Sequence, residues 1–210
     1  TLTGGAGDDT FIFATTAGLE ATDTVVGGAG TDTISLTATA AVTAVLTGVR
    51  TVEKVITTGN GGNVVITVGS DSVLAASTSL ITDASSVSNG TNTLNYDGSA
   101  ISTSTKTQSV TGTAGNDSIV GGAGNDTYVI NNAADVVLEG TVLATEIDAV
   151  NVNLSVDGTY SLGANIENGA IVATDTSLLL NLTGNALANS LTGNSGDNVL
   201  DGAAGADNLV

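Results

Sequence analysis

Short runs of β-branched and other apolar residues alternate with clusters of Gly, Asn, Asp and Ser along much of the chain. In DAVNVNLS, the residues Ala149, Val150, Val152 and Leu154 fall mostly on one side of an extended segment, which is typical of a strand with one buried face. The runs recur at intervals of about 15–20 residues, which suits one strand in each coil of a repeating structure. The predicted strands are 63–68, 79–82, 93–96, 135–138, 146–154, 166–172 and 178–182.

The segment 39–55 is ambiguous, because its sequence fits either a short helix or two strands, with Gly48 as a break. It holds two of the three basic residues, Arg50 and Lys54. These two residues suggest either a solvated face, which we favour, or a lateral or lipopolysaccharide contact.

Seven segments share one nine-residue pattern, beginning at Gly4, Gly27, Gly112, Gly121, Gly184, Gly193 and Gly202. Several follow one another directly, such as those at 112 and 121. The eighth position is always large and apolar: Phe11, Ile34, Ile119, Tyr128, Leu191, Leu200 and Leu209. The sixth position is Asp9, Asp32, Asp117, Asp126, Asn189, Asn198 or Asp207. Agreement among seven segments indicates a real internal repeat.

Each position of the pattern has a physical role. Glycines at the first, second and fourth positions allow positive φ values and sharp turns, so that backbone carbonyls point to one place. The Asp at the sixth position adds a carboxylate, and an all-oxygen ligand set suits a hard cation such as Ca²⁺. Positions seven to nine form a short strand whose middle side chain enters the core. Two nonapeptides then make a coil of about 18 residues.

The pattern G-G-x-G-x-D-x-U-x resembles that of the RTX calcium-binding proteins. This resemblance implies a right-handed parallel β-roll or β-helix with ions between turns, type I secretion, and folding outside the cell in millimolar calcium. It also implies metal-binding carboxylates at Asp9, Asp32, Asp117, Asp126 and Asp207. The carbonyls implied as further ligands belong to Gly5, Gly7, Gly28, Gly30, Gly122 and Gly124.

Some repeats depart from the pattern. Asn189 and Asn198 replace the sixth-position Asp, and Leu187 replaces a fourth-position Gly. We expect these turns to close by amide hydrogen bonds and to hold a weak ion or none, although Asn198 remains a candidate ligand. Calcium is expected mainly in the first half of the chain and around residues 112–126. Asp135, Glu139, Glu146 and Asp148 are possible extra ligands that no nine-residue period supports.

We predict one continuous all-β solenoid over residues 1–210. Nonapeptides occupy 4–12, 27–35, 112–129 and 184–210, and rungs without the motif occupy 36–111 and 130–183. Each rung of such a stack buries its faces only against its neighbours. The chain starts at Thr1 and stops directly after a ninth-position residue. We therefore expect it to be a piece of a longer protein or to stack onto other copies.

Composition favours this architecture. The chain has five aromatic residues and no Trp, Met, Pro, Cys or His, so its apolar interior consists mainly of small layers of Val, Ile, Leu and Ala. The formal net charge is −18, which disfavours nucleic acids and anionic membranes as partners and attracts cations. No apolar run approaches the length of about 20 residues that a membrane-spanning helix needs.

The composition is similar to that of RTX-type S-layer proteins and large RTX adhesins. This resemblance implies a secreted structural module, in an S-layer, matrix filament or adhesin, that associates with itself, with neighbouring repeats of a longer chain or with cell-surface polysaccharide. Catalysis is not expected, because His and Cys are absent, and Glu146, Asp148 and Glu53 are only nominal acids for glycoside chemistry. Two alternatives remain open. One alternative is that the chain is the RTX part of an exoenzyme, such as a protease, lipase or polysaccharide-modifying enzyme. The other is an ice- or carbohydrate-binding solenoid with outward Thr pairs such as Thr31/Thr33.

Overall fold

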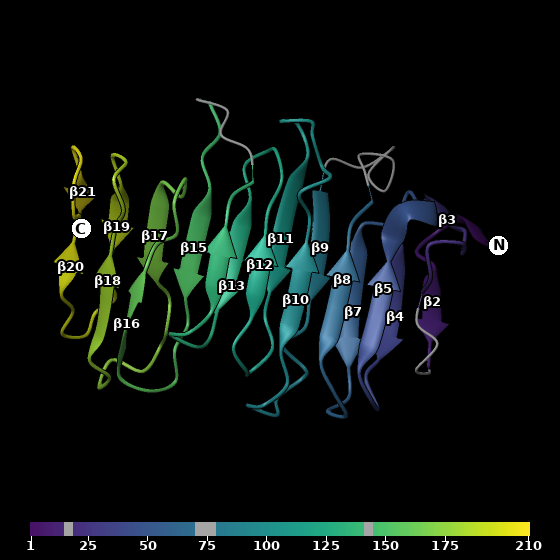
Figure 1. Ribbon diagram of the computed structural model, residues 1–210, viewed down its shortest axis with the longest axis horizontal. Helices are drawn as coiled ribbons and strands as arrows, with labels where there is room; N and C mark the ends of the chain where they lie inside the picture. The colour runs from purple at the N-terminus through teal and green to yellow at the C-terminus, as the bar shows by residue number, and fades with distance from the viewer. Residues whose placement is uncertain (15–18, 70–78, 141–144) are drawn as a thin grey trace.

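The computed structural model describes residues 1–14, 19–69, 79–140 and 145–210. Its strands lie side by side in one elongated stack, and the two termini lie at opposite ends of that stack (Figure 1). All the strand pairs in the described residues are parallel. The predicted all-β parallel solenoid is therefore confirmed.

One wall of the solenoid is a ten-stranded sheet in which successive strands are neighbours. Its first five strands are β2 (Thr10–Phe13), β4 (Thr33–Thr37), β7 (Lys54–Thr58), β9 (Ser79–Asp83) and β11 (Thr107–Thr111). The other five are β13 (Thr127–Ile130), β15 (Ala149–Val152), β17 (Asn168–Ile171), β19 (Ser190–Thr192) and β21 (Asn208–Leu209).

Three smaller sheets complete the coils. A five-stranded sheet contains β5 (Val42–Val45), β8 (Val64–Thr67), β10 (Leu94–Asp97), β12 (Ser118–Val120) and β14 (Val136–Leu138). Towards the C-terminus it is followed by a sheet of β16 (Gly158–Ser161), β18 (Leu180–Thr183) and β20 (Leu200–Asp201). At the N-terminal end a third sheet contains β1 (Leu2–Ala6), β3 (Val25–Ala29) and β6 (Val49–Arg50).

All seven predicted strand segments overlap an observed strand, from β8 within 63–68 to β18, which begins within 178–182. The ambiguous segment 39–55 forms β5 and β6, joined by the 3-10 turn η1 (Leu46–Gly48). Strands β1, β3, β11 and β16 lie in segments for which no strand was predicted, and β1 and β3 contain glycines that were predicted to form turns.

The length of a coil varies along the stack. Where two nonapeptides follow one another, strand partners are 18 positions apart, as in Ser109 and Thr127. Elsewhere the coil is longer: Phe11 pairs with Ile34, and Ser79 pairs with Thr107. The expected coil of about 18 residues is thus right only where nonapeptides are consecutive, because turns without the motif have other lengths.

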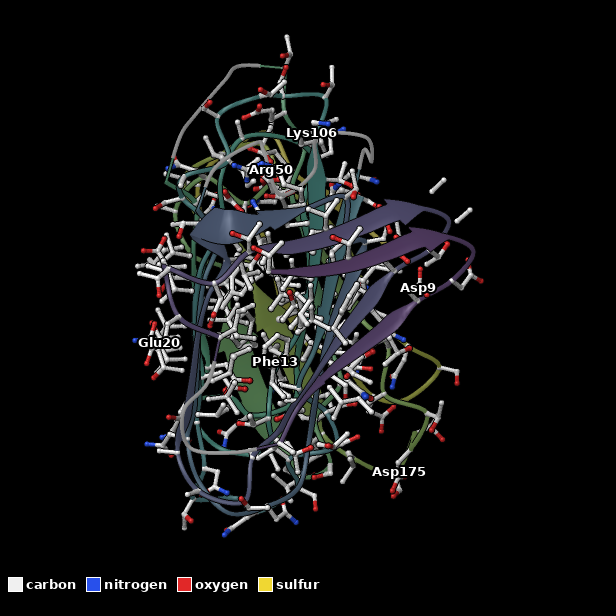
Figure 2. The ribbon with its side chains drawn as sticks, turned by 90° about the vertical axis from the view of Figure 1, so that its right-hand side faces the viewer. Asp9, Phe13, Glu20, Arg50, Lys106 and Asp175 are labelled. Atoms are coloured by element: carbon white, nitrogen blue, oxygen red, sulfur yellow. The ribbon has the colours of Figure 1, made fainter. Side chains whose placement is uncertain are left out.

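Eighth-position residues line the interior. Ile34, Ile119, Tyr128 and Leu191 are fully buried, and Phe11 and Leu200 pack against the core. Leu209 is more exposed, at 46 %, because it lies on β21, which pairs with β19 alone. Figure 2 looks along the stack and shows Phe13 inside the flattened cross-section.

Two edges of the cross-section carry the turns. We call the upper edge the set of turns that lead into the strands of the ten-stranded sheet; Arg50 and Lys106 lie there, at the top of Figure 2. The lower edge is the set of turns that follow those strands, and Asp175 lies there. Acidic residues on the same edge can lie close together, whereas those on opposite edges are separated by the strands.

Candidate metal centre

A column of mainly polar side chains runs along the upper edge, at positions that are in register from strand to strand of the ten-stranded sheet. Its members lie directly before their strands, except that two are the second residues of β9 and β11. From the N-terminus its members are Asp9, Asp32, Glu53, Leu80, Gln108, Asp126, Asp148, Glu167, Asn189 and Asp207. All except Leu80 have a carboxylate or amide side chain. Sequential parallel strands are about 4.8 Å apart, so neighbouring members of this column lie close enough to interact.

Side chains in the column bond to the backbone one rung earlier. The Asp9 N–H donates to Asp32 Oδ1 at 2.9 Å, and the Asp32 N–H donates to Glu53 Oε2 at 2.8 Å. The same contact joins the Asp126 N–H to Asp148 Oδ1 and the Asp148 N–H to Glu167 Oε2. Charge-assisted bonds of this kind fix the position of each carboxylate and tie the rungs together.

First-position glycines leave room for the sixth-position carboxylates. A Cβ atom added to Gly4 would lie 2.3 Å from Asp9 Oδ2, and one added to Gly27 would lie 2.4 Å from Asp32 Oδ2. On the lower edge, a Cβ atom on Gly112 would lie 2.0 Å from Asp117 Oδ2. These three Oδ2 atoms are buried and accept no hydrogen bond. A buried carboxylate oxygen without a donor is costly and is an oxygen that a cation can take.

Five of the six glycines predicted as carbonyl ligands have the expected positive φ, although Gly5 and Gly28 lie within strands β1 and β3 and not in turns. Positive φ values occur at Gly5, Gly7, Gly28, Gly30 and Gly124 but not at Gly122. Whether their carbonyls bind metal stays a prediction.

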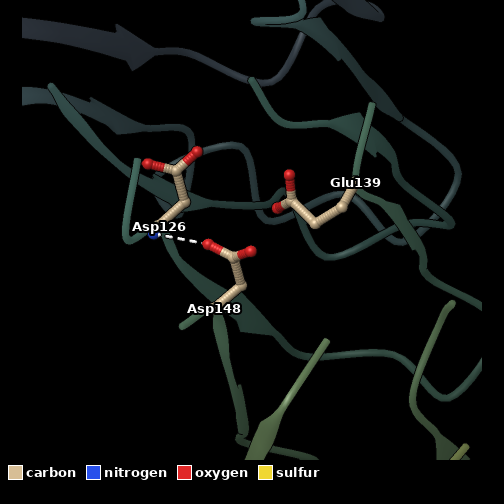
Figure 3. A group of neighbouring side chains, drawn as sticks. All are labelled: Asp126, Glu139 and Asp148. Atoms are coloured by element: carbon tan, nitrogen blue, oxygen red, sulfur yellow. Dashed lines mark hydrogen bonds between the residues drawn. The ribbon is translucent and has the colours of Figure 1, made fainter. Parts of the chain in front are cut away.

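The densest acidic group lies in the middle of the upper edge, around Asp126. Ligand oxygens of Asp126, Glu139 and Asp148 all lie within 4.8 Å of one another, and their side chains point toward a common space (Figure 3). We call these three residues the central cluster. Asp126 ends its nonapeptide turn before β13, whereas Glu139 and Asp148 flank the next turn of the same edge, between β14 and β15.

Further polar groups surround the central cluster. The Tyr128 hydroxyl donates to Glu139 Oε1, and the Gly124 N–H donates to Glu146 Oε1 at 2.9 Å. Glu139 Oε2 and Glu146 Oε2 have no hydrogen-bond partner, although only 8 % and 7 % of these residues is exposed. The site therefore contains free carboxylate oxygens in a buried position.

Burial and mutual repulsion make this group hard to ionise. Burial is the main cause that raises the pKa of Glu139 to about 9, of Asp148 to about 7 and of Asp126 to about 6. The neighbouring charges of Asp126, Glu146 and Asp148 add to this rise. A divalent cation would offset both effects, because it neutralises the carboxylates and supplies the missing partner of their free oxygens. The residues present therefore fit a hard cation.

The other predicted site residues lie apart from the central cluster. Asp117 is on the lower edge, where its N–H donates to Asp135 Oδ1; Asp135 also accepts the N–H groups of Asn131 and Asn132. Asp207 accepts the Asn189 N–H at 2.9 Å near the C-terminus. Asp9 and Asp32 lie at the N-terminal end of the upper edge.

The two Asn turns close as expected. Asn198 accepts the Asn194 N–H and donates from Nδ2 to the Leu180 carbonyl. Asn189 likewise donates to the Ile166 carbonyl. Amide hydrogen bonds take the place of a carboxylate here, so the prediction that these turns close by amide hydrogen bonds is confirmed.

The nonapeptide pattern does not include all the upper-edge carboxylates. Glu139, Glu146 and Asp148 were set aside because no nine-residue period supports them, and Glu53 was considered only as a nominal acid. One sequence signal was present: Glu53, Asp148 and Glu167 each stand directly before a strand of the ten-stranded sheet, which is the place of the sixth residue in a nonapeptide. Glu139 has no such signal, since it follows a strand.

The fold and the site together define a parallel β-solenoid with acidic turns whose carboxylates fit a metal ion. The family of the RTX calcium-binding nonapeptide repeat matches the chain in four copies, at residues 1–14, 17–37, 107–137 and 182–210. These segments cover slightly less than half of the chain. The chain thus contains repeats of the RTX calcium-binding type, and calcium is the metal that these repeats bind.

The searches of curated proteins and of solved structures gave no match to this chain. Among the described residues, no helix is long and apolar enough to cross a membrane. Bound calcium would supply positive charge at the central cluster, where Asp126, Glu139 and Asp148 would hold it.

Proposed function

We propose that this calcium-binding structural module belongs to a bacterial surface protein exported by type I secretion, in an S-layer, a matrix filament or an adhesin. The supporting observation is the column of buried and half-buried carboxylates, which links rungs along the same edge of the stack. Calcium binding at these positions would be coupled to folding of the chain, because the rungs that hold the ion also form the sheet. Extracellular calcium modules typically bind at about 10⁻⁴–10⁻³ M, so folding would await export.

The distribution of charge supports lateral association. Outward-facing residues of the ten-stranded sheet include only two charged side chains, Lys54 and Asp83, although the chain has a net charge of −18. Two such faces can approach each other without the repulsion that the acidic edges would produce. A face with so little net charge suits packing against a second copy of the chain.

Electron microscopy and light scattering with and without calcium test the proposal. We expect sheets or filaments in millimolar calcium and none after chelation. Ser109→Glu places a charge on the outer face of the ten-stranded sheet and should prevent assembly, while Asn95→Glu, at an exposed position on the five-stranded sheet, should not. A monomer in calcium for the unmodified chain would contradict the structural role.

We also propose that this chain carries no catalytic activity. The acids that are nominal catalysts have structural partners: Glu146 accepts the Gly124 N–H, and Glu53 accepts the Asp32 N–H. Asp148 likewise accepts the Asp126 N–H beside the central cluster. Turnover of alginate or peptide substrates by the purified chain would overturn this proposal and favour the exoenzyme alternative.

A further inference from the structure

The third turn of the upper edge is not a nonapeptide, yet it places two residues in the positions of one. Val26 pairs with Arg50 and Thr33 pairs with Lys54. Thr51 therefore lies beside Gly27, the first residue of its nonapeptide, and Glu53 lies beside Asp32, the sixth. Only Val52 separates Thr51 from Glu53, so the sequence shows no repeat here.

The oxygen atoms in this turn repeat an arrangement from the preceding pair of rungs. A Cβ atom on Gly4 would lie 2.3 Å from Asp9 Oδ2 and 2.7 Å from the Gly27 carbonyl oxygen. One rung later, a Cβ atom on Gly27 would lie 2.4 Å from Asp32 Oδ2 and 2.0 Å from the Thr51 carbonyl oxygen. The Thr51 carbonyl thus replaces that of a first-position glycine.

The backbone of Thr51 is held in an unusual conformation. Its φ is 50°, in the left-handed region that β-branched residues rarely adopt. Its hydroxyl accepts the Gly28 N–H at 2.8 Å, which fixes the turn against the preceding rung. The Thr51 carbonyl oxygen therefore approaches the same position beside Gly27 as Asp32 Oδ2.

Asp32 provides an independent sign of a ligand. Its side chain is 0 % exposed, and Oδ1 accepts the Asp9 N–H. Oδ2, on the side of Gly27 and Thr51, is buried and has no partner. Glu53 approaches the same residue, since its Oε2 accepts the Asp32 N–H at 2.8 Å.

We propose that Asp32 Oδ2, the Thr51 carbonyl oxygen and the Glu53 carboxylate form a divalent cation site between the second and third rungs. Two ligands of one Ca²⁺, each at about 2.3–2.6 Å from the ion, lie at most about 5 Å apart. Asp32 Oδ2 and the Thr51 carbonyl oxygen satisfy this limit, because they lie 2.4 Å and 2.0 Å from the same position, that of a Cβ atom added to Gly27. Calcium binding thereby extends into a rung without the nonapeptide motif. This inference rests on calcium binding by the chain and not on its surface role.

Counting bound calcium after equilibrium dialysis tests the site. Glu53→Gln removes the charge but keeps an oxygen that accepts the Asp32 N–H, and it should lower the count by one ion per chain. Asp157→Asn is the matched control, because exposed Asp157 likewise accepts a backbone N–H from another rung, that of Leu179, but lies outside the upper-edge column. It should leave the count unchanged.

Two further results decide the assignment. Thr51→Gly keeps the main-chain carbonyl and adopts positive φ without strain, so it should retain the ion; loss of the ion would overturn the role of the carbonyl. An unchanged number of bound calcium ions in Glu53→Gln would overturn the site. Loss of an ion in Asp126→Asn would then show only that the chain binds calcium at the central cluster. If Glu53→Gln does not fold, a crystal structure in millimolar calcium replaces it, and absence of an ion beside Asp32 Oδ2 would contradict the proposal.

Discussion

The backbone N–H of Asp126 donates a hydrogen bond of 2.8 Å to Oδ1 of Asp148, one rung further along the solenoid (Figure 3). The same two side chains share the central cluster with Glu139. One carboxylate thus joins two rungs and lines the candidate ion site. Ion binding and stacking of rungs are therefore physically coupled at this position.

Removal of calcium should lower the stability of the chain, so that part of the population unfolds at neutral pH. Chelation would leave the buried carboxylates of the central cluster to repel one another and would leave their free oxygens without a partner. We expect the β-sheet signal in circular dichroism to fall on addition of excess EDTA and to return with calcium, while added magnesium should restore it less well. A spectrum unchanged by EDTA would contradict calcium-dependent folding.

Asp148→Asn should weaken calcium binding without breaking the contact between rungs. The amide oxygen still accepts the Asp126 N–H, but one negative charge leaves the cluster, so affinity should fall by about tenfold or more, which is about 1.4 kcal/mol. Isothermal titration calorimetry measures this change. Asp157→Asn is the control, because exposed Asp157 accepts the Leu179 N–H in the same way; equal affinities for the two variants would argue against Asp148 as a ligand.

Tyr128→Phe should destabilise the chain more without calcium than with it. The variant deprives Glu139 of its hydroxyl donor, and an unsatisfied buried acceptor costs about 1–3 kcal/mol; bound calcium would take over as partner. Urea unfolding in calcium-free and calcium-containing buffer gives both values. Tyr96→Phe removes a bond to Gln108 Oε1 and should cost the same in both buffers. If the loss for Tyr128→Phe is equally insensitive to calcium, Glu139 is not a ligand.

The calcium-free chain should become less stable as pH rises from about 4 to about 7. Burial raises the pKa of Asp126 to about 6 and of Asp148 to about 7 from 3.8, so in this interval the folded chain holds more protons than the unfolded chain. Calcium affinity should change in the opposite direction, because protons compete with the ion for these carboxylates. Urea unfolding in metal-free buffer and calcium titrations at pH 5 and pH 8 check both signs. A calcium-free chain that is more stable at pH 8 than at pH 5 would refute the predicted loss of stability with rising pH.

Asn189→Asp should destabilise the calcium-free chain by about 3 kcal/mol or more. Asn189 Nδ2 donates to the carbonyl oxygens of Ile166 and Glu167, and a carboxylate would place a buried charge against these acceptors. Thermal unfolding in metal-free buffer measures the loss. Asn181→Asp, at a site where the amide makes an exposed contact with Thr159, should change stability little. An unchanged midpoint for Asn189→Asp would show that the turn is not closed by its amide.

Local chemistry was sufficient to predict the class of fold. Glycine at fixed offsets, an apolar eighth position and a sixth-position Asp act within one turn and the strand that follows it, so they can be recognised without knowing the partner rung. For that reason the burial of Ile34 and Tyr128 and the buried carboxylates of Asp32 and Asp126 follow from the pattern.

The neighbours of each carboxylate were not predictable in the same way. Asp126 meets Asp148 at 22 positions, whereas Asp117 meets Asp135 at 18, because the turns between strands differ in length. A nine-residue period cannot find a partner at a variable distance, and so Glu139 and Asp148 had no support from spacing.

The sequence by itself determined that the chain stacks in parallel rungs and which turns carry a calcium motif, since those properties arise within each repeat. Only the tertiary structure decided that Glu139 and Asp148 complete the group around Asp126 and that Thr51 and Glu53 stand beside Gly27 and Asp32. The physical reason is that an ion between rungs takes its ligands across the stack, and the pairing of strands sets which residues face one another there.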